Sequence, residues 1–219
     1  MKYISFSLWG SLPMYCVGAI ENLKLAKEIY PDWKCLFYVD DTVPKNIVED
    51  ISKNDGEIIF MGKNNRGSFW GMYWRFTTND RPDSDVFISR DCDSRLNFRE
   101  KAAVDEWLVS DKGFHIMHDH YGHRSVPILG GMWGAKKGCI DNITEKIFKW
   151  GKYDRKGIDQ HFLWNSIWPI VKDGKCISHG TQWAARWGEY KQFPQHDPLK
   201  YGGTYVGEIF DENNNPVKS

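Results

Sequence analysis

Two aspartates separated by one residue follow a short apolar segment near the middle of the chain. The segment Asp85–Ser89 has strand composition, and Asp91 and Asp93 come almost directly after it. Carboxylate oxygens are the ligands that Mg²⁺ and Mn²⁺ prefer, and two of them leave positions open for water and phosphate oxygens. An Asp-x-Asp pair alone is common in solvated turns. At the end of a central strand of an α/β chain, however, its position favours a metal site.

Arginines flank the two aspartates on both sides. Guanidinium groups match phosphate oxygens by their fork geometry, so arginines among carboxylates are suited to a metal-bound diphosphate. The alternative is that they only neutralise the aspartates or lie on the solvent face of the following helix. We assign Arg99 to that helix face, whereas Arg90 and Arg95 fit either role equally well.

Composition narrows the class of protein. The chain has 219 residues, of which 41% are hydrophobic and 26% charged, as in one soluble globular domain. Its 29 basic and 29 acidic residues balance, which excludes the broad basic field of a general nucleic-acid binder. The five cysteines are scattered without a C-x-x-C pair, and no apolar run reaches about 18 residues. We therefore expect a cytoplasmic protein with no transmembrane segment.

The first half of the chain alternates strand-like and helix-like segments. In such an order, strands of continuous apolar character predict a mainly parallel sheet covered by helices on both faces. Ligands bind at the carboxyl ends of the strands in sheets of this kind. The expected strands are Tyr3–Trp9, Lys34–Val39, Glu57–Met61 and Asp85–Ser89, and the expected helices are Met14–Ile29, Lys45–Ser52 and Gly67–Thr77.

The second half is less regular. Asn97 and Glu100 form a capping box ahead of a predicted helix. The other expected segments are the helices Phe98–Val109, Ile140–Trp150 and Ile158–Ile167, which Pro169 ends, and the strands Phe114–Met117, Val126–Leu129 and Cys176–Ser178. We expect one α/β domain over residues 1–210 and a flexible C-terminal tail over residues 211–219, where the composition is that of a frayed end.

Four segments in a fixed order carry a resemblance to a known family. They are the opening strand, Ser89-Arg90-Asp91-Cys92-Asp93-Ser94-Arg95, Gly130-Gly131-Met132-Trp133-Gly134 and Asp159-Gln160-His161-Phe162-Leu163. Together they resemble nucleotide-sugar-dependent glycosyltransferases of the GT-A fold, especially small bacterial and viral enzymes with a Ser-Arg-Asp-x-Asp-Ser-Arg segment. The resemblance spans Tyr3 to about His179. It implies a mixed, mainly parallel sheet flanked by helices, and Mn²⁺- or Mg²⁺-dependent transfer of a sugar from a UDP- or GDP-sugar to a glycan or other hydroxyl acceptor.

The resemblance also implies roles for individual residues. Asp93 would bind the metal directly, Asp91 would contact the metal or the ribose, and His179 would be a third metal ligand. The donor would be bound by Ser7, Trp9, Arg75, Arg90, Asp91, Gly130 and Gly131, with the two glycines letting the backbone pass close to the sugar. A surface arginine stacked on Trp74 is an equally good account of Arg75, and an ordinary turn would explain the glycine pair.

Asp159 and Gln160 open a predicted helix, which leaves several roles for them. Asp159 would suffice as an N-cap. The resemblance instead implies an acidic or amide group beneath the donor sugar. In an inverting enzyme Asp159 would be the general base, and in a retaining one Gln160 or Asp159 would support a cationic intermediate.

Two other functions compete with glycosyl transfer. A sugar nucleotidyltransferase would use the same nucleotide site, but it usually carries a basic, glycine-rich loop after the first strand, and the segment from Ser7 to Pro13 has neither feature. A non-catalytic carbohydrate-binding protein would explain the 11 tryptophans, but it leaves the aspartates without a role. The dense group His115, His118, His120 and His123 lacks zinc-site geometry, so we interpret it as surface or acceptor-cleft histidines.

Overall fold

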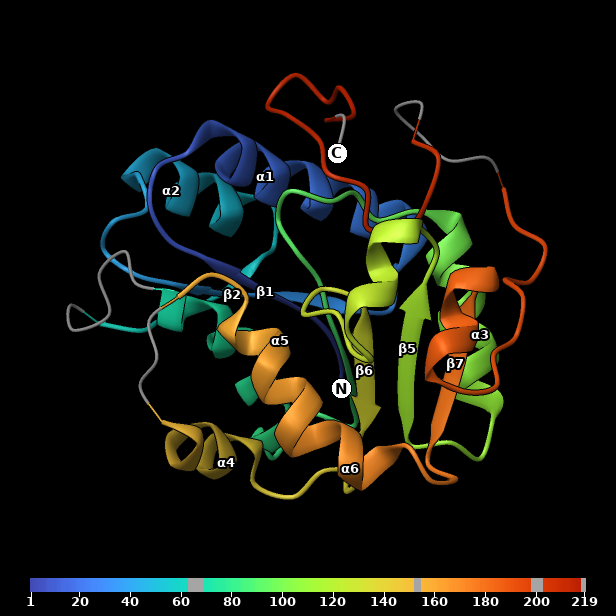
Figure 1. Ribbon diagram of the computed structural model, residues 1–219. Helices are drawn as coiled ribbons and strands as arrows, with labels where there is room; N and C mark the ends of the chain where they lie inside the picture. The colour runs from blue at the N-terminus through green and yellow to red at the C-terminus, as the bar shows by residue number, and fades with distance from the viewer. Residues whose placement is uncertain (63–68, 152–154, 198–202, 218–219) are drawn as a thin grey trace.

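All strands of the described chain belong to one sheet. The computed structural model describes residues 1–62, 69–151, 155–197 and 203–217 (Figure 1). Seven strands run in the order β3-β2-β1-β4-β6-β5-β7. Their bounds are β1 Lys2–Leu8, β2 Lys34–Val39, β3 Glu57–Phe60, β4 Val86–Ser89, β5 Phe114–His118, β6 Trp133–Lys136 and β7 Cys176–Gly180.

The sheet is mixed but mainly parallel, as the alternation of segments predicts. Strand β1 pairs in parallel with β2 and β4, β2 with β3, and β5 with β7. Only β6 runs antiparallel to its neighbours, β4 and β5. The carboxyl ends of β1, β2 and β4 therefore meet at one edge of the sheet, which is where ligands bind in such folds.

Helices cover both faces of this sheet. They are α1 Pro13–Ile29, α2 Lys45–Lys53, α3 Phe98–Val109, α4 Ile143–Trp150, α5 Ile158–Phe162 and α6 Trp168–Val171. The 3₁₀ segments are η2 Phe69–Asp80, η3 Tyr121–Ser125 and η5 Gln182–Trp187, and η4 Leu163–Ile167 is a π-helical turn. One apolar core joins the sheet to α1, α2 and α3, and a second joins its other face to η2, α4 and the α5–α6 segment. Figure 1 shows α1 and α2 on one side of β1 and β2, and α4 and α5 on the other. The result is a single α/β domain.

Two expected elements differ from the structure. The predicted strand over Val126–Leu129 is wrong, since the strand that joins the sheet is β6. Pro127 has no N–H to donate to a strand ladder, so this stretch is a poor central strand. The helix predicted to end at Pro169 continues through a π-helical turn, η4, into α6. Pro169 lies in the first turn of α6, where its missing N–H costs least.

Other differences are smaller. The segment predicted as a helix over Gly67–Thr77 forms 3₁₀ turns from Phe69 onward, and its first two residues lie outside the described part of the chain. The flexibility of the C-terminal tail stays a prediction; its residues 211–217 take part in a hydrogen-bonded turn, and residues 218–219 lie outside the described part. Among the helices of the described residues, none has the length and apolar character needed to span a bilayer.

Candidate active site

A buried arginine joins two of the predicted site residues. Arg75 lies in η2, with almost no exposed side-chain surface. Its Nη1 ion-pairs with Asp91, and its Nη2 lies 3.5 Å from Oδ2 of Asp159, a residue 84 positions further along the chain. The same Nη1 donates to the carbonyl of Arg90 at 2.9 Å. A single guanidinium therefore connects the end of β4 to the start of α5.

Serines of β1 hold Arg75 in place. The Oγ of Ser7 accepts the backbone N–H of Arg75 at 3.0 Å, and the Oγ of Ser5 donates to the carbonyl of Arg75 at 2.8 Å. Ser7 thus contacts the arginine at the centre of the cluster, and its role in donor binding stays a prediction.

Trp9, the other donor residue predicted after β1, packs against η2. A Cβ added to Gly71 would lie 2.7 Å from the Trp9 indole, so the two are in close contact. The Trp9 ring also meets the Trp74 ring edge-on, with 6.1 Å between centroids. The indole is half-buried beside the carboxyl end of β1, and its role in donor binding stays a prediction.

Asp159 is a buried carboxyl in the first turn of α5. The N-cap of this helix is Gly157, so Asp159 lies two residues inside the helix and is not its N-cap. Oδ1 of Asp159 has no hydrogen-bond partner within the described residues. Burial raises the pKa of Asp159 to about 6, with Arg75 opposing the shift and Asp91 adding to it. Such a carboxyl can take up a proton near neutral pH.

The glycine pair lies against these carboxylates. A Cβ on Gly130 would come within 2.4 Å of Oδ2 of Asp159 and 2.8 Å of Nη2 of Arg75. A Cβ on Gly131 would come within 2.0 Å of Oδ2 of Asp91 and 3.0 Å of its backbone nitrogen. Only residues without side chains fit at these two positions, which explains the Gly-Gly pair by close approach rather than by an ordinary turn.

This contact leads to a prediction for Gly131→Ala. We expect the added methyl group to displace the Asp91 carboxylate and to weaken Mn²⁺ binding about tenfold, because forced rearrangement of a packed site costs about 1–3 kcal/mol. Titration with Mn²⁺ followed by electron paramagnetic resonance measures it. Gly122→Ala is the control, because a Cβ there approaches no atom closer than 3.4 Å. Equal Mn²⁺ affinity in the two variants would contradict the expectation.

Asp93 is the second carboxyl of the Asp-x-Asp pair. Burial and the neighbouring charge of Asp91 raise the pKa of Asp93 to about 7. The Asp91 carboxyl is 45% exposed, so the pair is open to solvent on one side. Burial raises the pKa of Tyr15, and the negative charges of Asp93 and Asp91 raise it further, so this phenol lies near both carboxylates. Sequence reasoning missed Tyr15, although the first turn of a helix that follows β1 must face this edge of the sheet.

The two carboxylates alone would supply only some of the ligands of a metal ion. Within the described residues, no three His, Cys, Asp or Glu side chains are grouped so as to hold a metal ion. Asp91 and Asp93 offer two oxygen-bearing groups, which suits hard cations whose other positions are filled by water and phosphate. A divalent cation would also relieve the electrostatic cost of two neighbouring carboxylates, of which Asp93 is half-buried.

The guanidinium of Arg90 pairs with a residue outside this cluster, which disfavours its predicted role in donor binding. Its Nε lies 3.2 Å from Oε2 of Glu100, and both side chains are almost fully buried. The hydroxyl of Tyr30 donates to Glu100 at 3.1 Å. Asn97 does cap α3 by accepting the N–H of Glu100, but the Glu100 carboxylate binds Arg90 instead of completing a capping box.

We expect Arg90→Met to destabilise the fold without changing the affinity for nucleotide. Removing one partner leaves Glu100 buried without its cation, a loss of about 3 kcal/mol in the free energy of unfolding. Urea unfolding of wild type and variant measures this loss, with Arg155→Met, an exposed arginine, as the control. Unchanged stability together with weakened nucleotide binding would return Arg90 to the donor site.

His179 also lies apart from the aspartates. It is fully buried on β7, and its Nδ1 is 3.0 Å from Nε2 of His115. Its Nε2 lies 3.3 Å from Oε2 of Glu106 on α3. Both ring nitrogens thus face partners within the second half of the fold, so the structure does not bring His179 to Asp91 and Asp93.

The histidine group was interpreted as surface or acceptor-cleft residues, and a surface position is wrong for two of its members. His115 and His118, both on β5, are fully buried. His120 and His123 are half-buried in and beside η3, where His120 stacks on Tyr205 with 4.1 Å between ring centroids. Gln160, the other predicted catalytic residue, is half-buried next to Asp159.

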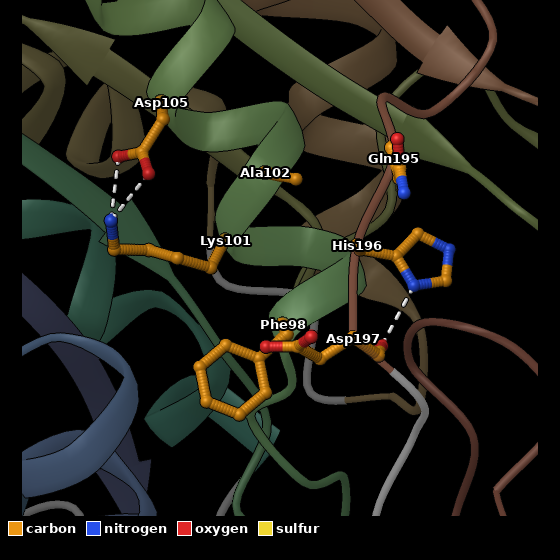
Figure 2. Close-up of a pocket in the computed structure, with 7 residues that line it drawn as sticks. All are labelled: Phe98, Lys101, Ala102, Asp105, Gln195, His196 and Asp197. Carbon is orange, nitrogen blue, oxygen red and sulfur yellow. Dashed lines mark hydrogen bonds and ion pairs between the residues drawn. The ribbon is translucent and has the colours of Figure 1, made fainter.

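A separate surface pocket contains none of the predicted site residues. It lies between α3 and the segment around His196, and an ion pair between Lys101 and Asp105 forms one wall (Figure 2). The residues lining the pocket are Phe98, Lys101, Ala102, Asp105, Gln195, His196 and Asp197.

Arg99, assigned from the sequence to the solvent face, forms two 2.7 Å hydrogen bonds with Asp119 instead and donates to His196 at 2.8 Å.

Comparison with solved structures identifies the fold. Glucosyl-3-phosphoglycerate synthase from Mycobacterium tuberculosis, solved with Mn²⁺, UDP-glucose and phosphoglyceric acid, superposes with a TM-score of 0.52 at 9% identity over 82% of this chain and 69% of that chain. A mannosyltransferase from Pyrobaculum calidifontis, solved with GDP-mannose and Mn²⁺, gives 0.51 at 12% identity over 81% and 54%. The chain has a GT-A-like fold.

These likenesses establish the fold alone. The chain spans about half the length of the mannosyltransferase. Another enzyme has a similar fold: 4-diphosphocytidyl-2C-methyl-D-erythritol synthase from Anaerococcus prevotii gives a TM-score of 0.51 at 10% identity over 84% of this chain and 90% of that chain. No protein-family model and no curated protein sequence matches the chain.

Proposed function

We propose that the protein is a metal-dependent glycosyltransferase that moves a sugar from a nucleoside-diphosphate sugar to a hydroxyl group of a glycan or another acceptor. The observation that carries the proposal is the cluster in which Arg75 joins Asp91 to Asp159 beside two obligatory glycines. Arg75, the Asp-x-Asp pair, the buried carboxyl of Asp159 and the glycine pair come from four distant segments of the chain. Their convergence at the carboxyl ends of the strands supports a binding site in a GT-A-like fold.

Asp91 and Asp93 would hold the Mn²⁺ or Mg²⁺ ion. When bound, the ion supplies positive charge that offsets the charge developing on the departing nucleoside diphosphate. The remaining steps belong to the chain. Arg75 keeps the Asp91 carboxylate oriented, and Gly130 and Gly131 let the Asp159 and Asp91 carboxylates pack against the backbone.

Asp159 is the general base in this proposal. The acceptor hydroxyl oxygen forms a bond to the anomeric carbon of the sugar, and its proton passes to the unpaired Oδ1 of Asp159. The bond between that carbon and the diphosphate oxygen breaks, and its electron pair leaves with the diphosphate. This single displacement inverts the anomeric centre. The orphaned Oδ1 and the raised pKa of Asp159 support the role.

Titration with UDP- and GDP-sugars, with Mn²⁺ present or removed by a chelator, tests the proposal. Metal-dependent release of the nucleoside diphosphate supports glycosyl transfer. Turnover that depends on pyrophosphate would favour a nucleotidyltransferase, the second function that this fold can serve. The stretch from Leu8 to Pro13 holds no lysine or arginine, which speaks against it. Sugar binding that ignores metal would favour a binding protein.

The cysteines support the proposed cytoplasmic location. All five lie in described parts of the chain, and none is paired in a disulfide. Unpaired cysteines are typical of proteins that work in a reducing compartment.

A further inference from the structure

The loop that carries the two aspartates is held on one side by α1. This carboxylate loop, residues 91–95, packs so closely on the helix that a Cβ on Gly18 would lie 1.9 Å from the carbonyl oxygen of Cys92. Nδ2 of Asn22 donates to the carbonyls of Cys92 at 3.4 Å and Ser94 at 2.9 Å. The helix therefore fixes the inner side of the loop.

A small hairpin near the end of the described chain holds the other side. This C-terminal hairpin, residues 209–217, is drawn in red in Figure 1 and is closed by a 3.0 Å hydrogen bond from the N–H of Asp211 to the carbonyl of Asn215. Phe210 is buried, and its N–H donates to the carbonyl of Asp93 at 2.8 Å. The hairpin is thus bonded to the backbone of the predicted metal ligand itself.

Arg95 ties the hairpin to the loop with one guanidinium group. On the loop side, its Nη1 donates to the carbonyls of Cys92 at 3.3 Å and Ser94 at 2.9 Å. On the hairpin side, its Nε donates to Oδ1 of Asn214 at 2.8 Å and its Nη2 to the carbonyl of Asp211 at 3.3 Å. Arg95 is buried, so of its two roles left open by the sequence the structure favours the structural one over phosphate binding.

The turn of the hairpin presents Asn214 in a defined conformation. Asn214 has a φ of 61°, in the left-handed region that asparagine adopts more readily than most residues. The Asp211 carboxylate accepts the N–H groups of Asn213 at 2.9 Å and Asn215 at 2.8 Å, which fixes the turn around it. The side-chain oxygen of Asn214 is therefore placed for Arg95 by local hydrogen bonds.

We propose that the C-terminal hairpin is a positioning element of the active site, which acts through Asn214 and Arg95 to hold Asp93 where it binds a divalent cation. This inference rests on the proposed function. Neither residue contacts the reacting atoms, so both are positioning residues. Outer-shell partners of metal ligands commonly contribute 10- to 100-fold in metal affinity.

Asn214→Gly tests the proposal in the full-length protein. Glycine keeps the left-handed backbone and removes the acceptor for Arg95. We expect the Mn²⁺ dissociation constant, measured by electron paramagnetic resonance, to rise about tenfold. Asn214→Asp restores an acceptor for Arg95 and tolerates the same backbone region, so it should recover wild-type affinity. Asn213→Ala, on the exposed side of the same turn, should bind Mn²⁺ like wild type.

The outcomes separate this proposal from the proposed function. Wild-type Mn²⁺ affinity in Asn214→Gly would overturn the positioning role, as would a loss that Asn214→Asp fails to reverse or that Asn213→Ala shares. A wild-type protein that binds no Mn²⁺ in the presence of UDP or GDP would instead overturn the metal-dependent function, and this inference with it.

Discussion

Replacing Asp159 with asparagine should lower turnover by about 10²–10⁴-fold while the affinity for the donor changes little. Asparagine keeps the shape of the side chain but cannot take up the proton of the acceptor hydroxyl, and general-base catalysis contributes about this factor. Release of nucleoside diphosphate from the preferred UDP- or GDP-sugar gives kcat and KM separately. Gln160→Ala, at the adjacent half-buried position, should lower kcat less than tenfold.

The pH dependence of wild-type activity gives an independent check on the same residue. The base must be deprotonated, and burial raises the pKa of Asp159 to about 6. Activity should therefore fall as the pH drops through about 6, and this limb should be missing from the residual activity of Asp159→Asn. A greater loss in Gln160→Ala than in Asp159→Asn would contradict the base assignment and favour a retaining reaction. Normal turnover with lost stability would make Asp159 a structural residue.

Replacing Asp93 with alanine should weaken Mn²⁺ binding by more than about 10³-fold, or about 4 kcal/mol. The substitution leaves one carboxylate of the pair, and within the described residues no third His, Cys, Asp or Glu is grouped with it. Isothermal titration with Mn²⁺ and UDP or GDP measures the loss. Asp111→Ala removes an equal charge from a carboxyl that is 83% exposed, and it should bind Mn²⁺ like wild type.

Stability distinguishes a lost ligand from a damaged fold. Burial and Asp91 raise the pKa of Asp93 to about 7, so its charge opposes folding. The loss in the free energy of unfolding grows as the pH rises from about 4 to about 7, and it reaches its maximum above pH 7. At pH 8, Asp93→Asn should therefore unfold at the same temperature as wild type or higher, and at pH 4 the two should agree. Mn²⁺ binding by Asp93→Ala at wild-type affinity would contradict the metal assignment.

Most of the fold could be predicted because local patterns specify it. Short apolar runs such as Lys34–Val39 alternate with helical segments, and this order favours parallel strands with crossover helices. Two predicted elements were wrong because the effect of proline on the backbone was misjudged. Pro127 made Val126–Leu129 a poor strand, and a π-helical turn let the chain continue helically into Pro169.

For the candidate site, too, the sequence indicated some properties and not others. The sequence singled out Asp91 and Asp93 because they follow a recognisable strand, and it singled out Asp159 through the family resemblance; their roles stay predictions. Their electrostatics could not be read there, since the pKa of a carboxyl depends on burial and on charges far along the chain. Tyr15 near the aspartates is the clearest example, because only packing of α1 against the carboxylate loop places it there.

The sequence by itself determined the α/β class, the mainly parallel sheet and the edge at which polar residues gather. Those properties follow from hydrophobic periodicity, which acts within one segment at a time. Only the tertiary structure decided which residue meets which: Arg75 bridges Asp91 and Asp159, Arg90 is bound to Glu100, and His179 pairs with His115. The same strand or helix would allow each of these side chains to point in another direction. A buried charge or ring nitrogen is costly without a partner, and only the packing of distant segments brings that partner close.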